Sequence, residues 1–230
     1  MLKRKGGALK FSGNTNTDFL KIVAAITMLV DHVGRVFFQN ILLFDIIGRL
    51  SFPLFAYCLA LGAGYTKNFK KYFLRLLAFA IISQPIYSLL FNRPLTQLNV
   101  IFTLLFGLIA IYALREKKYF LFAATLIGSY FLAADYGLDG VLLILIFYIF
   151  KDKLNILLAV SFAWLVLYFV PLAKPDFYLG NVGLSVAGFA VFSLIFIALK
   201  TNFKIKLNKY FFYIFYPAHL ALLYLIRLFI

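Results

Sequence analysis

Long apolar runs separated by short polar connections repeat along the whole chain. A helix needs about 20 mainly apolar residues to cross roughly 30 Å of hydrocarbon. By this criterion nine segments are predicted to span a membrane: 18–38, 44–64, 72–91, 98–114, 119–134, 138–150, 155–170, 180–199 and 210–229. The segments 119–134 and 138–150 are short, so they are either two crossings or one broken, re-entrant pair. The pattern predicts an all-α polytopic bundle of about nine helices (8–10) over residues 18–230, preceded by a basic tail over 1–17.

The composition agrees with a membrane protein. Apolar residues make up 64% of the 230 residues, charged residues 13%, and the mean hydropathy is +0.97. A soluble domain has about 45–50% apolar and about 25% charged residues, and a fold of this size cannot bury so much apolar surface. A soluble enzyme and a disordered chain are therefore excluded. The single cysteine, Cys58, excludes a disulfide framework and a cysteine-built metal site, and no metal site is predicted.

The net charge of +15 is unevenly distributed along the chain. Sixteen of the 23 Lys and Arg residues lie in the N-terminal tail and in every second connection after it. The other connections hold only Arg93 and Lys174. Cytoplasmic loops carry such an excess of positive charge, so the N-terminus is predicted to be cytoplasmic and the C-terminus external. This distribution argues against nucleic-acid binding as the reason for the charge.

A few ionisable residues interrupt the apolar segments. Such a group costs at least about 2.5–3.5 kcal/mol at the centre of a bilayer, so each is a functional candidate. They are Lys21, Asp31, His32 and Arg35 in the first segment, Arg49 in the second and His219 in the last. Purely structural roles remain open for these residues. A histidine can serve only as a hydrogen-bond partner between helices, Lys21 can extend to the membrane surface, and Asp31 and Arg35 can form a structural ion pair.

The first segment has a regular spacing. Lys21 and His32 are eleven residues apart, which places them on one helix face, roughly 16 Å apart along the axis. Asp31 and Arg35 are separated by four residues and can pair. Asp31 and His32 are adjacent and point about 100° apart, so Asp31 is expected to pair with Arg35 or Arg49 instead.

Two prolines are expected to disturb helices beside these residues. Pro53 cannot donate to the carbonyl of Arg49, and Pro217 cannot donate to that of Tyr213. Tyr216 and His219 are three residues apart and share a face. The turn Asp135-Tyr136-Gly137-Leu138-Asp139-Gly140 is either ordinary turn chemistry or an external acceptor site.

Several blocks of residues together resemble the TraX family. They are Asp31-His32, Gly48 to Phe55, Arg75-Leu76-Leu77, Ser83-Gln84-Pro85, Asn99 to Gly107, Asp135 to Gly140, and Phe212 to His219. The blocks follow the family's order and cover nearly the whole chain. The family's eponym is tied to N-acetylation of a conjugative pilin subunit. The family is similar to the wider membrane acyltransferase-3 group, whose first span often carries an Arg, ten further residues and a His. Here Lys21 and His32 hold those two positions, and Gln84 stands where an acidic residue is more usual.

The resemblance implies a multi-pass acyltransferase of the bacterial cytoplasmic membrane with acetyl-CoA as co-substrate. The CoA phosphates are expected at Lys21, Lys67, Lys70, Lys71 and Arg75, below the catalytic residues His32, Arg49, His219 and Asp31. His32 is the expected general base or transient acyl carrier, and Arg49 the group that stabilises developing negative charge. Arg35, Tyr216 and Tyr136 are expected to contact the acceptor.

Two rival functions fit the same residues. A transporter or flippase also has kinked spans and ionisable groups at mid-membrane, although no inverted repeat is visible in this chain. A non-catalytic assembly factor would bind a small membrane protein and tolerate replacement of its histidines. For the acyltransferase, the expected partners are acyl-CoA and membrane lipid. The expected acceptor is the N-terminal amine of a small pilin-like membrane protein, or a hydroxyl or amine of an envelope glycan.

Overall fold

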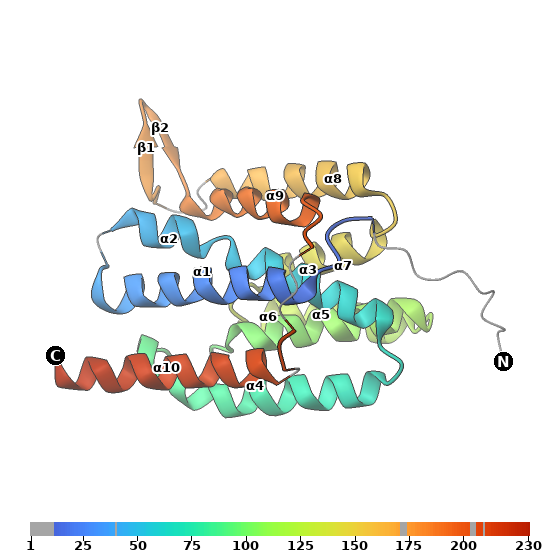
Figure 1. Ribbon diagram of the computed structural model, residues 1–230, viewed down its shortest axis with the longest axis horizontal. Coiled ribbons are helices and arrows are strands. Elements are labelled where there is room, and N and C mark those ends of the chain that lie inside the picture. Colours follow the sequence, from blue (N-terminus) through green and yellow to red (C-terminus); the bar gives the residue numbers. More distant parts are fainter. Residues whose placement is uncertain (1–11, 40, 171–173, 203–205, 209) are drawn as a thin grey trace.

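The structure is a computed structural model that describes residues 12–39, 41–170, 174–202, 206–208 and 210–230. Within these ranges the chain is mostly helical. The longest helices are α1 (Thr17–Phe37), α4 (Phe69–Phe91) and α10 (Phe211–Phe229), and α10 packs against both α1 and α4 (Figure 1). Helices α2 (Leu42–Gly48) and α3 (Ser51–Tyr65) pack against α1 as well.

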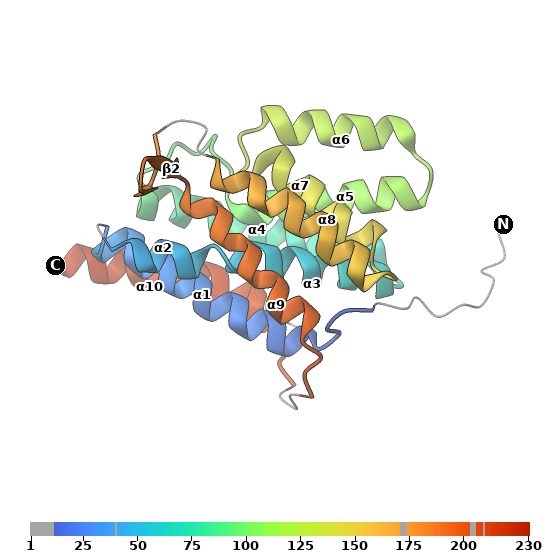
Figure 2. The ribbon, with the colours of Figure 1, turned by 90° about the horizontal axis from the view of Figure 1, so that it is seen from above.

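A second group of helices flanks α3. It consists of α5 (Val100–Arg115), α6 (Tyr119–Phe131) and α7 (Gly137–Ile149), with α6 outermost (Figure 2). Helix α8 (Leu154–Val166) continues into the 3₁₀ turn η1 (Leu167–Phe169) and packs on α7. Seven of the nine predicted segments therefore coincide with helices in the described part of the chain.

The predicted helix over 44–64 is not continuous. Helix α2 ends at Gly48 and α3 begins at Ser51, with Arg49 and Leu50 between them. Both intervening residues keep right-handed helical dihedrals, so the chain changes direction only moderately. The physical reason is Pro53, which lies in the first turn of α3 and has no N–H for the carbonyl of Arg49.

The prediction of a helix over 180–199 is wrong for its first residues. Strands β1 (Phe177–Leu179) and β2 (Val182–Leu184) form an antiparallel hairpin there, and it protrudes from the bundle (Figure 1). Gly180 adopts φ +60° in the turn, a conformation that glycine accepts without strain. The helical part is shorter than predicted and consists of a 3₁₀ segment, η2 (Val186–Phe192), and α9 (Ser193–Ala198).

Three helical segments of the described residues are long and apolar enough to cross a membrane. They are Leu42–Tyr65, which joins α2 and α3, then Phe69–Phe91 and Phe211–Phe229. The helices from Val100 to Ala198 are apolar but shorter, and α6, α7 and α8 have 13 residues each. Helix α1 has 21 residues but contains four charged side chains. A membrane protein is indicated, while the count of nine crossings stays a prediction.

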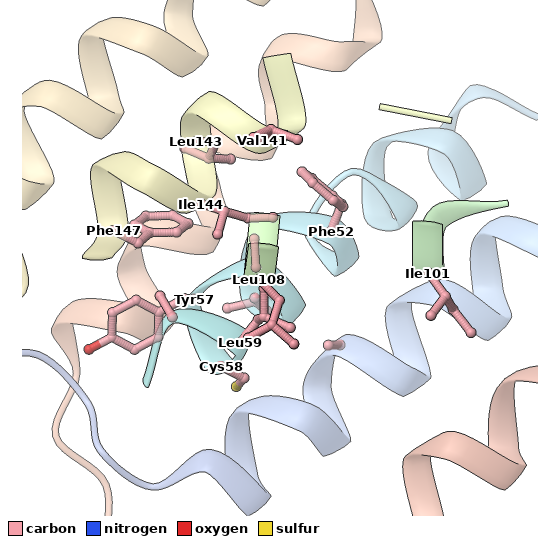
Figure 3. Close-up of a cluster of buried hydrophobic side chains, with 14 of the residues drawn as sticks. Phe52, Tyr57, Cys58, Leu59, Ile101, Leu108, Val141, Leu143, Ile144 and Phe147 are labelled. Carbon is pink, nitrogen blue, oxygen red and sulfur yellow. The ribbon is translucent and has the colours of Figure 1, made fainter. Parts of the chain in front are cut away.

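A large part of the apolar core lies between α3, α5 and α7. Tyr57, Leu108, Ile144 and Phe147 are almost completely buried where these helices meet (Figure 3). Gly107 allows this approach, because a Cβ there would collide with the Ile144 side chain. By contrast, large apolar side chains point outward on the peripheral helices, for example Phe120 and Phe131 of α6, with 89% and 75% of their surface exposed. Such a periphery suits lipid contact.

Hydrogen bonds hold the loops at one end of the bundle. Gln84 of α4 accepts from the backbone and side-chain amides of Asn99 at 2.9 and 2.8 Å and donates to the carbonyls of Leu95 and Gln97 at 3.2 and 2.8 Å. This fixes the segment before α5. The same segment pairs with the α6–α7 loop, because Leu98 exchanges backbone hydrogen bonds with Ala133 and Asp135.

The predicted tail over 1–17 is described only from residue 12. Residues 1–11 lie outside the described part of the chain. Ser12 donates to the carbonyl of Lys151, and Asn14 bonds to residues of α9 and to Thr201. Asn16 then caps α1 by accepting from the N–H of Phe19. The segment that leads into α1 is thus attached to the bundle.

Candidate active site

A cavity of about 520 Å³ runs through the bundle among α1, α3, α4, α5 and α10. Lys21 and Arg75 line one part of it, whereas Asp31, His32 and Arg35 line another. Lys21 and Arg35 are fourteen residues apart on α1, which corresponds to roughly 21 Å along the helix axis. The cavity therefore connects two levels of the molecule that carry different charged groups.

His32 of α1 and His219 of α10 form a buried pair. His32 Nδ1 lies 2.8 Å from His219 Nε2, and the two rings stack with an interplanar angle of 9°. His219 Nδ1 lies 2.7 Å from the carbonyl oxygen of Phe215. The sequence predicted two separate intramembrane histidines, and the fold brings them into direct contact.

The second contact fixes the tautomers of a neutral pair. A carbonyl oxygen only accepts, so His219 Nδ1 must carry the hydrogen and its Nε2 must accept. His32 Nδ1 therefore donates to His219, which leaves the lone pair of His32 on Nε2. His32 lines the cavity, and its Nε2 has no hydrogen-bond partner among the described residues. This is the arrangement of a base held in position by a second group.

Asp31 is the centre of an ion-pair network, as its position on α1 predicted. Its carboxylate lies 2.8 Å from Arg35 Nε and 4.0 Å from the guanidinium of Arg49. His32 Nε2 is also 4.0 Å away, beyond hydrogen-bonding distance, so the expectation that Asp31 pairs with arginine is confirmed. Gly48 makes this packing feasible, since a Cβ there would collide with the Asp31 carboxylate.

Arg49 lies apart from the main cavity. It lines a separate outer cavity of about 420 Å³ together with Asp45 and Asp176. Its guanidinium is 3.8 Å from Asp45 and 4.0 Å from Asp31, and its Nε is buried without a hydrogen-bond partner in the described ranges. The arginine that lines the cavity at the level of His32 is therefore Arg35, while Arg49 is linked to this level only by its 4.0 Å contact with Asp31.

At the opposite level of the cavity, two of the five predicted phosphate ligands line the wall. Lys21 Nζ lies 5.6 Å from the centre of the Phe212 ring, and Arg75 packs over Tyr72 at 5.8 Å. Arg75 Nε is buried and has no hydrogen-bond partner among the described residues. The structure does not place Lys67, Lys70 and Lys71 in the lining, because these side chains are exposed around the start of α4.

Both predicted tyrosines line the cavity near His32. Tyr216 is 5% exposed, and its ring lies 6.4 Å from that of His32. Tyr136 stacks on Phe52 with 3.8 Å between ring centres, and its N–H donates to Thr103. Burial raises the pKa of the Tyr136 hydroxyl to about 12, so it stays protonated at neutral pH and can donate a hydrogen bond.

A further polar chamber adjoins the His32 level of the cavity. It has a volume of about 270 Å³ and shares Arg35, Tyr87, Phe91 and Asp135 with the main cavity. No role in the site was predicted for Asp135, although its turn was a candidate acceptor site. The acidic side chain in this turn could have indicated a functional residue. However, Asp and Gly are common in turns of any protein, so the sequence alone did not single out Asp135.

Asp135 lines both the main cavity and the outer chamber, and its surface is exposed there. Desolvation by the surrounding protein raises the pKa of its carboxyl group, and this effect is opposed by the positive charges of Arg35, Arg49 and Arg93 and by a hydrogen bond from Tyr87. The carboxylate is thus electrostatically coupled to the same arginines that surround Asp31.

The chain was compared with known proteins. It is 28% identical to the probable fimbrial assembly protein FimC, serogroup H1, of Dichelobacter nodosus, over 94% of this chain and 98% of the relative. It is also 31% identical to the uncharacterized protein RP591 of Rickettsia prowazekii (strain Madrid E), over 44% of this chain and 38% of that protein. No solved structure matches significantly. The model of the family described as TraX protein matches residues 16–227, and the chain therefore belongs to the TraX family.

Proposed function

We propose that this protein is a membrane acyltransferase that moves an acetyl group from acetyl-CoA to an acceptor amine or hydroxyl. The observation that carries the proposal is the His32–His219 pair, whose tautomers leave an unprotonated, unpartnered nitrogen at the cavity wall. Membership of the TraX family supports the same reading. The rest of the mechanism follows from where the cavity places the other side chains.

The Lys21 level of the cavity suits the donor. Arg75 Nε is a buried donor without a partner among the described residues, and Lys21 supplies a second positive charge there. Both suit a phosphate or another anion. Acetyl-CoA would supply an activated thioester. The distance of roughly 16 Å from Lys21 to His32 suits an extended arm that reaches from this level to the base. The exposed Lys67, Lys70 and Lys71 would attract the anionic donor to this side.

At the other level, His32 Nε2 would take the proton of the attacking acceptor. His219 would hold the ring by accepting from Nδ1, and the resulting imidazolium would lie 4.0 Å from the Asp31 carboxylate. That negative charge stabilises the protonated ring. Arg35 lines the cavity and pairs with Asp31, and it would stabilise negative charge that develops on the thioester oxygen. Arg49, which lies 4.0 Å from Asp31, would help to hold that carboxylate in position.

The test is transfer of label from radioactive acetyl-CoA in membranes that contain the protein. Wild type is expected to label an acceptor, and His32→Ala is expected to lower the rate by about 10²–10⁴-fold. Cys58→Ala is the matched control, because Cys58 lines the same cavity and has no part in the chemistry. If His32→Ala transfers label like the wild type, the assignment of the base is wrong. If folded wild type labels nothing from acetyl-CoA or longer acyl-CoAs, the transferase is refuted and transport through the cavity becomes the better explanation.

The name of the Dichelobacter relative favours a second candidate, a role in assembling fimbriae or pili. The two functions are compatible if the acceptor is a pilin-like subunit. The His32→Ala substitution distinguishes the two functions. If the protein only binds a partner, pilus assembly should proceed in this variant. Loss of assembly together with loss of label would place the chemistry within the assembly process.

A further inference from the structure

The outer chamber has a mixed charged lining. Its wall is formed by Gly34, Arg35, Gln39, Asp45, Tyr87, Phe91, Arg93 and Asp135, from the ends of α1 and α4, from α2 and from the α6–α7 loop. It adjoins the main cavity at the level of His32, where the two share four residues. A molecule in the chamber would therefore approach His32 from the side opposite to Lys21 and Arg75.

Two of the four charges of the chamber are already paired. Arg35 binds Asp31 at 2.8 Å, and Asp45 lies 3.8 Å from Arg49. Asp135 and Arg93 remain: within the described ranges, no ion pair within 4.0 Å involves either side chain. The Arg93 guanidinium donates to the side-chain oxygen of Gln97 at 3.3 Å, and the side chain is exposed at the rim. The chamber thus offers one carboxylate that has a hydrogen bond from Tyr87 but no ion pair within these ranges, and one exposed guanidinium.

The carboxylate is held in place by the backbone. The N–H of Asp135 donates to the carbonyl of Leu98 at 3.0 Å, and Leu98 donates to Ala133. The segment that contains Leu98 is in turn fixed by Gln84 and Asn99. The Asp135 side chain therefore lies on a loop that hydrogen bonds hold in place, and it lines a cavity without an ion-pair partner among the described residues. Such a carboxylate can bind a positively charged group of a ligand.

We propose that the outer chamber binds the acceptor and selects an aminoalkyl phosphate, with its ammonium group on Asp135 and its anionic group on Arg93. This inference rests on the proposed transferase function and goes further by naming the acceptor class. The same chemistry occurs in a free aminoalkyl phosphate and in the head group of an amine-bearing phospholipid. A neutral hydroxyl acceptor would leave both groups without a partner of opposite charge, so the chamber would not favour it over an acceptor that carries an ammonium group and an anionic group.

The reaction balances with the groups present. The bound ammonium group gives its first proton to Asp135, from which it passes to water in the chamber. The amine nitrogen then attacks the thioester carbon, the C–S bond breaks, and a C–N bond forms. The second proton goes to His32 Nε2 and from there to the departing thiolate. The products are the N-acetylated acceptor, free CoA thiol and one released proton.

The experiment compares three acceptors with the full-length protein in phosphatidylcholine vesicles supplied with labelled acetyl-CoA. They are phosphoethanolamine (amine and phosphate), ethanolamine (amine alone) and glycerol phosphate (hydroxyl and phosphate). We expect phosphoethanolamine to be the best substrate. Asp135→Asn should lower kcat/KM for both amines by about 10- to 100-fold and change the reaction of glycerol phosphate less than twofold. Arg93→Gln should reduce the rate with phosphoethanolamine to that with ethanolamine.

Asp139→Asn is the matched control, since Asp139 lies on the same turn but lines neither cavity, and it should behave like wild type. Vesicles that contain phosphatidylethanolamine separate the two sources of the amine: label on lipid identifies a head group, and label on the soluble probe alone identifies a free acceptor. Equal use of amines and glycerol phosphate, or an unaffected Asp135→Asn, overturns this inference while leaving the transferase intact. Absence of any acetyl transfer by wild type refutes the transferase and the inference with it.

Discussion

At the scale of single residues, the chemistry depends on which nitrogen of each histidine carries the hydrogen. The carbonyl of Phe215 sets the tautomer of His219, and His219 sets that of His32. His219 does not line the cavity, so the role that we propose for it is to position His32. In the proposed mechanism, the contact of His219 with the Phe215 carbonyl therefore decides which histidine is the base and which one positions it. Their separation in the sequence does not decide this.

We predict that His219→Ala lowers acetyl transfer by about 10–100-fold, less than His32→Ala, because the base remains but loses its orientation. His219→Gln keeps a side-chain oxygen that can accept from His32 Nδ1 and should restore part of the rate. Steady-state kinetics check this, with the loss expected in kcat and not in KM for acetyl-CoA. A His219→Ala variant as active as wild type would show that the histidine pair is only a packing contact.

At the scale of elements, the joint between α2 and α3 is adapted to Asp31. Gly48 ends α2 where the Asp31 carboxylate of α1 comes closest, and Arg49 follows with its guanidinium on the same carboxylate. The sequence showed Gly48, Arg49 and Pro53 in one block and offered Arg49 as a partner for Asp31, yet it did not show that Gly48 lies against the same carboxylate.

Gly48→Ala is predicted to destabilise the protein by about 1–3 kcal/mol, because the new methyl group would overlap the Asp31 side chain. Thermal unfolding in detergent measures the effect. Gly128→Ala in α6 is the matched control, since the atoms nearest to its added Cβ are at 3.9 Å, an ordinary contact. An unchanged unfolding temperature for Gly48→Ala would mean that α1 and α2 separate easily at this point.

Gln84 is a second element-scale contact, and an acid would not serve there. Its Nε2 donates to two carbonyls, of Leu95 and Gln97, and a carboxylate cannot donate to either when ionised. Gln84→Glu is expected to cost about 1–3 kcal/mol of stability and to lower transfer by loosening the loop that holds Asp135. Gln97→Glu is the control, because its side chain only accepts from the exposed Arg93. Equal stability of the two variants would contradict this account.

At the scale of the whole molecule, the cavity has two differently charged levels, and the charge distribution of the loops predicts which one faces the cytoplasm. Lys67, beside the Lys21 level, should be cytoplasmic, and Thr96, beside the Asp135 level, should be external. In a Cys58→Ala background, an impermeant maleimide should label Thr96→Cys in intact cells and Lys67→Cys only after lysis. Buried Cys58 in wild type should stay unlabelled. The reverse pattern would invert the orientation and refute the cytoplasmic donor.

The sequence by itself determined the class of protein and most of its helices. Long apolar runs and an excess of Lys and Arg in alternate loops can be recognised in the chain without knowledge of its fold. Helical spacing also determined the Asp31–Arg35 pair, because residues four apart on one helix are neighbours in any fold. The same local reasoning missed the hairpin at residues 177–184, where glycine turn geometry outweighed an apolar composition.

Only the tertiary structure decided the site. His32 and His219 are 187 residues apart, and no spacing rule links side chains on the first and last helices. The same holds for Asp135, which reaches the outer chamber because its loop bonds to the segment before α5. The displacement of Arg49 from the cavity and the exposure of Lys67, Lys70 and Lys71 are also results of packing. Contacts between distant helices depend on how their faces fit together, and one sequence read along its length does not contain that fit.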